Sequence, residues 1–276
     1  MKTIFIVTDF SDASHNASRY GIELADFFGA GVVLFNAYSV PVSIPETYVV
    51  IDPGDIRKSA EEQLQAEVLK LRKSTSHTIE ILAEEGVAAD IIISTAKKYD
   101  DCLIVCGMKG EGKSIKKVFG STVTALSRKS SIPMLVVPSD AIYAPIHNIA
   151  LASDIDIETD IHTVDMLQDI GEKSGAKLYV VRVIKDTMDE VQELMNRSER
   201  MRHHLKSLDP EFVFPHSNNI GEALQDFVKE YNVQLLAMIP HHHNIMERLL
   251  FHSETKQLIF HTHVPLLVLP EVKFSL

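Results

Sequence analysis

The chain has 276 residues, which is enough for two domains of ordinary size. Apolar residues make up 45 % and charged residues 24 %, which is typical of a folded globular protein and argues against a disordered one. The formal net charge of -11 at pH 7 disfavours binding to nucleic acid or to an anionic lipid surface, since both are negatively charged.

Two features of the chain favour a cytoplasmic protein without a membrane anchor. The apolar run at its start, Met1 to Val7, is too short for a signal peptide, and no run approaches the ~20 apolar residues that cross a bilayer. Cys102 and Cys106 fall on one predicted strand about 13 Å apart, too far to form a disulfide with each other. Their apolar neighbours predict buried thiols in a reducing compartment.

The first half of the chain alternates short apolar runs with amphipathic stretches. After the opening run Ile4 to Val7, apolar residues recur at the spacing of a helix, with Ser11 or Asp12 as the N-cap. Later runs, such as Leu103 to Cys106, are continuously apolar, which is typical of strands buried on both faces of a parallel sheet. This order predicts an α/β domain with helices on both sides. The apolar face of the first helix consists of Ala17, Tyr20, Gly21, Leu24, Ala25 and Phe28.

The second half of the chain repeats this pattern. Ile4 to Asp9 matches Ile149 to Asp154 at an offset of 145, since each is an apolar run that ends in a hydroxyl residue and Asp. Pro133 to Pro138 matches Pro265 to Pro270 at an offset of 132. The offset changes because the first half carries a proline-rich insertion, Ser39 to Pro53, which is the best candidate for a mobile cover near a pocket.

The repeat predicts the domain organisation. We expect two α/β domains, residues 1–140 and 145–276, with the boundary near Ser139 to Pro145. Each is expected to be a doubly wound parallel sheet of five strands. Each half is long enough to bury a core of its own.

The most informative segment runs from Cys106 to Thr122, between a predicted strand and a predicted helix from Thr122 to Lys129. Its glycines allow backbone N–H groups to approach phosphate oxygens closely and permit positive φ. Ser121 is placed to cap the helix, whose N-terminus favours an anion. Lysines gather here in an otherwise acidic chain, so the segment predicts a phosphate site. They are Lys109, Lys113, Lys116 and Lys117.

One interpretation of this segment is an enzyme site. The stretch Gly107 to Ser114 has the spacing of the phosphate loop of nucleoside triphosphatases, in which Lys113 would hold the phosphates. That loop usually follows the first strand of its domain, and a later strand ends in a magnesium-binding Asp. Here the stretch follows the fourth strand, and only Pro133 to Val137 comes after it before the repeat restarts. The position therefore disfavours a triphosphatase.

A second interpretation covers more of the chain. Three glycines and a serine in Gly107 to Ser121 have the spacing Gly-x2-Gly-x9-Gly-Ser. This resembles the ATP-binding signature of the universal stress protein family. The resemblance extends over nearly the whole chain as a tandem pair, from the strand that ends in Thr8-Asp9 to the strand Ile132 to Pro138 and its repeat. It implies the strand order 3-2-1-4-5 in each half, and pairing of the two last strands within the chain as an intramolecular pseudo-dimer.

The resemblance also implies a site for ATP, or for AMP or ADP, with or without Mg. In ATP-binding members, the Asp that ends the first strand contacts the base, and Asp9 matches it. Ala37 is nearest to the residue that lines the adenine pocket, and strands one and four meet at the switch point where such sheets bind ligands. Cys106 and Gly107 would flank the ribose, and the later residues would hold the phosphates. The implied site residues are Thr8, Asp9, Ala37, Cys106, Gly107, Gly110, Gly120, Ser121 and Thr122.

The second half lacks the glycines of this signature. An isoleucine and two histidines replace them, and Pro240 removes one N–H donor. A β-branched residue is strained if the position requires a positive φ, and larger side chains fill the space that a phosphate needs. We therefore expect only the first domain to bind a nucleotide. The replacements of Gly107, Gly110 and Gly120 are Ile239, His242 and His252.

Histidines gather in the second half, where 11 of the 13 lie from His147 onward. Imidazole is a common metal ligand, so a zinc or nickel site is one interpretation. The spacing matches no tetrahedral pattern, and the adjacent residues His241, His242 and His243 would point in different directions on a loop. An exposed polar loop is therefore favoured over a metal site.

The sequence contains no constellation that predicts efficient catalysis. Hydrolysis of ATP needs a positioned water and a base, and Asp9 is expected near the nucleotide base rather than the γ-phosphate. We therefore expect a stress-response protein that binds an adenine nucleotide and that forms a homodimer. The alternatives are an interaction scaffold that needs no nucleotide, and a slow ATPase.

Overall fold

The computed structural model describes residues 1–40, 52–72, 78–108, 120–153, 161–184, 199, 201–239 and 263–270. The first half contains β1 (Thr3–Val7), α1 (Asp12–Phe28), β2 (Gly31–Tyr38), α2 (Pro53–Leu71), β3 (Ile79–Glu85), α3 (Ala88–Ala96), β4 (Cys102–Met108), α4 (Ser121–Lys129) and β5 (Met134–Pro138). The second half contains β6 (Asn148–Ala152), η1 (Ile161–Val164), α5 (Asp165–Ser174), β7 (Lys177–Val181), η2 (Lys206–Leu208), β8 (Glu211–Val213), α7 (Ile220–Glu230), β9 (Leu235–Met238) and β10 (Leu266–Val268).

Several sequence predictions lie outside these residues. They include Gly110, Lys113 and most of the insertion Ser39 to Pro53, and also the histidine triplet at 241–243. In the ranges that the structure does describe, no helix is both long enough and apolar enough to cross a membrane.

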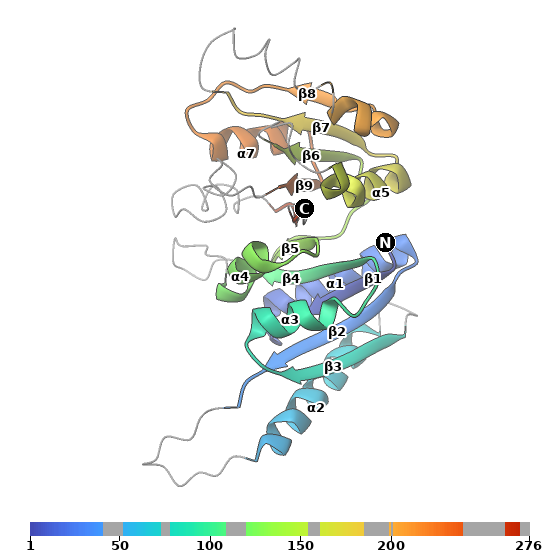
Figure 1. The fold of residues 1–276 in the computed structure, drawn as a ribbon, viewed down its shortest axis with the longest axis vertical. Coiled ribbons are helices and arrows are strands. Elements are labelled where there is room, and N and C mark those ends of the chain that lie inside the picture. The colour runs from blue at the N-terminus through green and yellow to red at the C-terminus, as the bar shows by residue number, and fades with distance from the viewer. Residues whose placement is uncertain are drawn as a thin grey trace, which may run out of the picture.

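The strands form one ten-stranded sheet in the order β3-β2-β1-β4-β5-β10-β9-β6-β7-β8 (Figure 1). Neighbours within each half are parallel, whereas β5 and β10 are antiparallel, with Leu135 opposite Leu267. Each half therefore has the predicted order 3-2-1-4-5, and the predicted pairing of the last strands is confirmed. This pairing joins the two expected five-stranded sheets into one sheet of ten strands.

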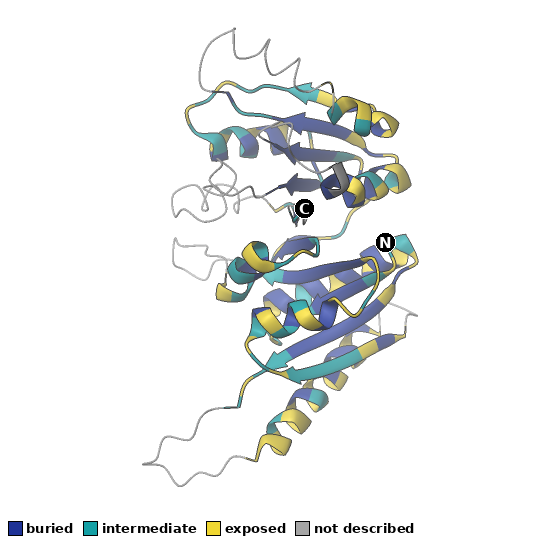
Figure 2. Cartoon of the chain, in the orientation of Figure 1, coloured by how far each residue is buried: buried dark blue, intermediate teal, exposed yellow. Residues whose placement is uncertain are grey.

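The helices cover both faces of the sheet, as the continuously apolar strands predicted. Helices α1, α2 and α5 pack on one face, and α3, α4 and α7 pack on the other (Figure 1). The central strands are buried on both faces, and Figure 2 shows them dark in both halves. Successive residues of β1 alternate between the two layers, since Ile4 and Ile6 contact the first layer and Phe5 contacts the second.

Helix α1 begins at the carboxyl end of β1. Its N-cap is Ser11, whose side chain accepts a hydrogen bond from the N–H of Ser14, which confirms one of the two predicted caps. It ends at Gly29, which has φ 66° and closes the helix in the left-handed conformation. Five residues of its predicted apolar face are buried and Phe28 is half-buried.

Side-chain contacts fasten the second half to α1. The amide of Asn16 donates to the backbone oxygens of Pro138 and Ala141, both at 2.9 Å, and so holds the chain where it leaves β5. From the second half, the ammonium of Lys173 donates to the backbone oxygen of Phe28 at 2.9 Å. The two halves therefore touch through α1 as well as through the β5–β10 pair.

The β5–β10 pair generates a prediction about stability. Leu267 is 0 % exposed and lies opposite Leu135, so Leu267→Ala would leave a cavity at the junction and lower the free energy of unfolding by about 2–5 kcal/mol. Leu69→Ala is the matched control, because this side chain is 65 % exposed and its loss should change stability by less than about 0.5 kcal/mol. Denaturant unfolding would measure both, and equal effects would contradict a packed junction.

Candidate functional site

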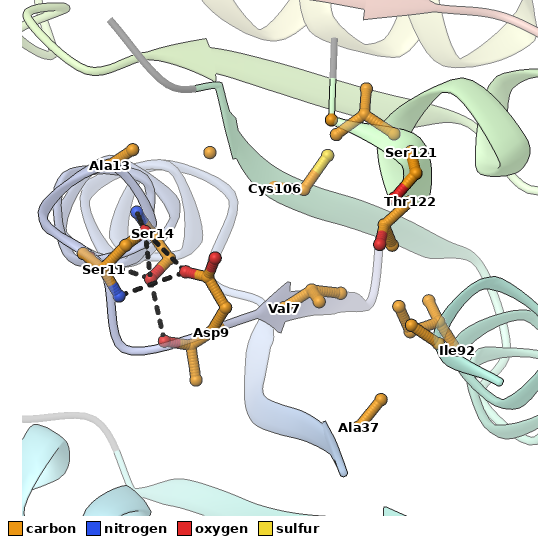
Figure 3. A pocket seen from close by; sticks show the side chains of 15 residues that line it. Val7, Asp9, Ser11, Ala13, Ser14, Ala37, Ile92, Cys106, Ser121 and Thr122 are labelled. Carbon is orange, nitrogen blue, oxygen red and sulfur yellow. Dashed lines mark hydrogen bonds between the residues drawn. The ribbon is translucent and has the colours of Figure 1, made fainter. Parts of the chain in front are cut away.

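A cavity of about 270 Å³ lies at the carboxyl ends of β1, β2 and β4 (Figure 3). The first turn of α1 borders it on one side, and the first turns of α3 and α4 border it on the other. This is the switch-point position expected for a ligand in a doubly wound sheet. Gly110 lies outside the described residues, but the other implied site residues all line the cavity. They are Thr8, Asp9, Ala37, Cys106, Gly107, Gly120, Ser121 and Thr122.

Asp9 follows β1 by two residues and is held by the first turn of α1. Its Oδ1 accepts a hydrogen bond from the N–H of Ser11 at 3.1 Å and another from the Ser11 hydroxyl at 2.5 Å. Figure 3 shows the carboxylate between this turn and the cavity. Burial acts to raise the pKa of this carboxyl, but hydrogen bonds from Ser11 and Ser14 outweigh it and lower the pKa overall. Asp9 is therefore an anion at neutral pH.

The turn that carries Asp9 has an unusual backbone. Phe10 has φ 62°, a left-handed conformation that bulky side chains rarely adopt and that costs about 1–3 kcal/mol. A local hydrogen bond compensates for part of this cost, because the N–H of Phe10 donates to Oγ1 of Thr8 at 3.0 Å. The buried hydroxyl of Thr8 also lies 3.1 Å from Oγ of Ser14. The Thr8 side chain therefore stabilises this turn through its contacts with Phe10 and Ser14.

Gly107 brings β4 and α1 together. A Cβ atom at this position would lie 2.4 Å from the backbone oxygen of Ala13 and 2.8 Å from the backbone nitrogen of Ser14. Both atoms belong to backbone that cannot turn aside, so this close approach requires glycine. Gly107 lies within β4, and the described glycines with positive φ are Gly29, Gly86 and Gly175, so the close approach and not a positive φ explains the glycine at this position.

The first turn of α4 faces the cavity from the opposite side. The helix begins at Ser121 with Gly120 as its N-cap, which corrects the prediction that Ser121 is the cap and Thr122 the first helical residue. Gly120 has φ -56°, and a Cβ there would meet nothing within 4 Å. The N–H groups of Ser121, Thr122 and Val123 have no partner within the helix, since the first helical bond is made by Thr124. The positive end of α4 therefore borders the cavity.

The remaining walls of the cavity are apolar or uncharged. Val7, Ala37 and Ile92 come from three separate elements and form the apolar part. Cys106 is buried, and this burial raises the pKa of its thiol to about 12, so the thiol is neutral. Cys102 and Cys106 are free and buried, as the sequence predicted.

Sequence reasoning missed part of this lining. Ser11 was identified only as a cap, although it also contacts Asp9. Ser14 was not identified as a lining residue, although the hydroxyl residues at the start of α1 could have pointed to it. Ala88 and Ile92 belong to α3, and no local motif points to them because packing alone brings α3 to the cavity.

The second half differs at the position equivalent to Gly107. Ile239 follows β9 and is 1 % exposed, so its side chain occupies interior space that a glycine leaves open. The two halves therefore differ at this position in side-chain volume. A cavity of about 390 Å³ lies elsewhere in this half, between the end of β8 and α7. Among the described residues, no group of three potential ligands could hold a metal ion.

Comparison with known proteins agrees with this architecture. The sequence model described as the universal stress protein family matches residues 1–138 and again residues 145–270. The chain belongs to the universal stress protein family. A universal stress protein of Methanocaldococcus jannaschii is 28 % identical over 138 residues, which are 49 % of this chain and 81 % of that protein.

Solved structures share the fold over the whole chain. A universal stress protein from Archaeoglobus fulgidus DSM 4304 has a TM-score of 0.75 at 17 % identity, with 98 % of each chain covered. A putative universal stress protein from Pseudomonas aeruginosa UCBPP-PA14 has a TM-score of 0.62 at 11 % identity, covering 98 % of this chain and 93 % of that one. The tandem arrangement of this universal stress protein is therefore a known fold.

The contact at Gly107 predicts that substitutions of Gly107 and Gly120 have different effects on stability. Gly107→Ser would force its side chain against the backbone of Ala13 and lower the free energy of unfolding by about 1–3 kcal/mol. Gly120→Ser should be neutral or slightly stabilising, since its Cβ has room and serine is a good N-cap. Thermal and denaturant unfolding would measure both, and a Gly107→Ser protein as stable as the parent would refute the close contact.

The charge of Asp9 generates a prediction about pH. Because the pKa of Asp9 in the folded protein is lowered, its contribution to stability is present above the pKa of an ordinary aspartate and is lost as pH falls through the folded value. Asp9→Asn lacks this contribution. Its free energy of unfolding should therefore fall less on acidification from neutral pH than that of the parent protein. Denaturant unfolding across a pH series would test this, and parallel curves would contradict it.

Proposed function

We propose that this universal stress protein binds an adenine nucleotide, with ATP as the favoured ligand, in the cavity of its first half. The observation that carries the proposal is the combination of three features around one cavity. These are the carboxylate of Asp9, apolar walls, and the N-terminus of α4 on the opposite side. A nucleotide has a flat base with polar edges at one end and anionic phosphates at the other, so its chemistry matches this distribution.

The base and ribose fit the side of the cavity near β1 and β2. Val7, Ala37 and Ile92 supply apolar surface for a ring, and Asp9 supplies an acceptor for an amino or hydroxyl group. An anionic carboxylate would repel a phosphate at this end. The orientation with the base near Asp9 is therefore favoured over the reverse orientation.

The phosphates fit the other side, against α4. The free N–H groups and the hydroxyls of Ser121 and Thr122 are donors for anionic oxygens. Lys109 and Lys113 belong to the segment between β4 and α4 that is outside the described residues, and we propose that this segment completes the phosphate site with Gly110. Mg²⁺ would be held mainly by the phosphates and water, as is usual for this ion.

We propose a binding module rather than an enzyme. Among the described residues that line the cavity, Asp9 is the only charged side chain, and α4 faces it from the opposite wall. A base that activates water must reach the γ-phosphate, and Asp9 at the base end would not. The slow-ATPase alternative depends on Lys113, and Lys113→Ala would abolish turnover if that alternative held.

The two domains, 1–140 and 145–276, are proposed to have different roles. The second would not bind ATP in the same way, because Ile239 fills the position of Gly107. Since β5 and β10 already pair within one chain, a homodimer would have to form through another surface. The nucleotide-independent scaffold remains the alternative function.

Calorimetric titration of the full chain with ATP and Mg²⁺ tests the proposal, after any co-purified nucleotide has been removed. We expect a stoichiometry near one per chain. Thr122→Asp should weaken ATP binding by about tenfold or more, because a carboxylate at the phosphate end repels the ligand. The new carboxylate interacts favourably with the positive N-terminus of α4 and should stabilise the fold by about 0.3–1 kcal/mol, so the protein should remain folded.

Thr124→Asp is the matched control, because Thr124 lies in the same helix but does not line the cavity. It should bind ATP nearly as well as the parent. Adenosine, which has no phosphate, should bind the parent and Thr122→Asp equally. A parent protein that binds no ATP would remove the proposed function and favour the scaffold, and two ATP per chain would contradict the assignment to the first half.

A further inference from the structure

The Asp9 side chain can serve as a fixed acceptor only if its orientation is restrained. Asp9 lies between β1 and α1, next to Phe10 with its left-handed backbone. Its contacts come from the start of α1. The N–H of Ser11 donates to Oδ1 at 3.1 Å, and the Ser11 hydroxyl donates to the same oxygen at 2.5 Å. Two donors on one oxygen fix both the direction and the rotation of a carboxylate.

We propose that Ser11 is a positioning residue of this site, which holds the Asp9 carboxylate in a fixed orientation at the wall of the cavity. The consequence for the ligand rests on the proposed function, whereas the hold on Asp9 does not. Ser11 would thus have a second role beyond ending the helix, because the same hydroxyl both caps α1 and orients the acceptor.

The hydrogen bonds around Ser11 give its hydroxyl a direction. As the N-cap, its oxygen accepts from the N–H of Ser14 at 3.3 Å, and its single proton is then free for another acceptor. The contact to Oδ1 of Asp9 is much shorter than the competing contact to Oγ of Ser14, which is 3.4 Å. The proton is therefore directed to Asp9, and the positive end of α1 strengthens this donation.

The backbone of Ser11 is itself held by a hydrogen bond from the core. The buried Ser14 donates from Oγ to the backbone oxygen of Ser11 at 2.9 Å and lies 3.1 Å from Oγ1 of Thr8. The amide of the buried Asn36, on β2, donates to the backbone oxygen of Thr8 at 2.8 Å. A chain of hydrogen bonds therefore connects β2, the end of β1 and the first turn of α1 to Asp9.

Few other groups act on the charge of Asp9. Cys106 is the other titratable residue among the described lining residues, and its thiol is neutral. His15, in the same turn as Ser14, contacts Glu67 of α2 and does not line the cavity. Burial raises the pKa of Asp9, and the donors of Ser11 act against it. Removing the Ser11 hydroxyl should therefore shift the Asp9 pKa upward.

The test uses two substitutions of Ser11 in the full chain. Ser11→Gly removes the hydroxyl but keeps the helix start, since glycine is nearly as good an N-cap as serine. Ser11→Thr keeps a hydroxyl at the same position. NMR titration of the Asp9 side-chain carboxyl carbon in the nucleotide-free protein, assigned with Asp9→Asn, would measure the pKa. Titration with ATP at neutral pH would measure affinity.

We expect the Asp9 titration to move upward in Ser11→Gly and to return in Ser11→Thr, with ATP binding weakened about 2- to 10-fold in the former. Ser14→Ala, which leaves the Ser11 hydroxyl in place, should give a smaller upward shift, and Ser11→Ala is the second variant without the hydroxyl if Ser11→Gly does not fold. An unchanged Asp9 titration in Ser11→Gly would overturn the assignment. A shifted titration in a protein that binds no ATP would support the hold on Asp9 and remove only the proposed function.

Discussion

The contact between Gly107 of β4 and the backbone of Ala13 in α1 determines how the helix meets the sheet beside the cavity of the first half. At this contact, the first turn of the helix rests directly on the strand, closer than any side chain at position 107 would permit. That turn carries Ser11 and Ser14, and Ser11 in turn holds Asp9. The wall of the cavity, the charge at its edge and the helix start therefore depend on one glycine.

The second half lacks this constraint. Ile239 occupies the equivalent position and is buried, so the strand end there is filled by a side chain. The sheet is nevertheless preserved, with the same strand order and the same two layers of helices. A fold built from buried parallel strands tolerates such a replacement, because the core lies between the strands and the helices, whereas Ile239 lies at the end of a strand.

The β5–β10 pair joins the two repeats into one sheet. Each half alone would leave an apolar edge strand open to association, and the antiparallel pairing covers both edges at once. The strands that border the cavity of the first half and strand β9, which precedes Ile239, therefore belong to one continuous sheet. The second half thus covers the edge strand of the first half.

The sequence by itself determined the class of fold, the repeat, the strand order implied by the family, and eight of the residues that line the cavity. The fold class and the repeat follow from periodic apolar runs, whereas the strand order and the site residues follow from the resemblance to the family. Only the tertiary structure decided why Gly107 must be glycine, that Gly120 and not Ser121 caps α4, and that α3 supplies a wall. The approach of Gly107 to α1 and the position of α3 depend on distances between segments far apart in the chain, and the cap of α4 depends on the backbone conformation at Gly120. A local sequence pattern identifies candidate residues, but the packing of the elements determines which residues come into contact.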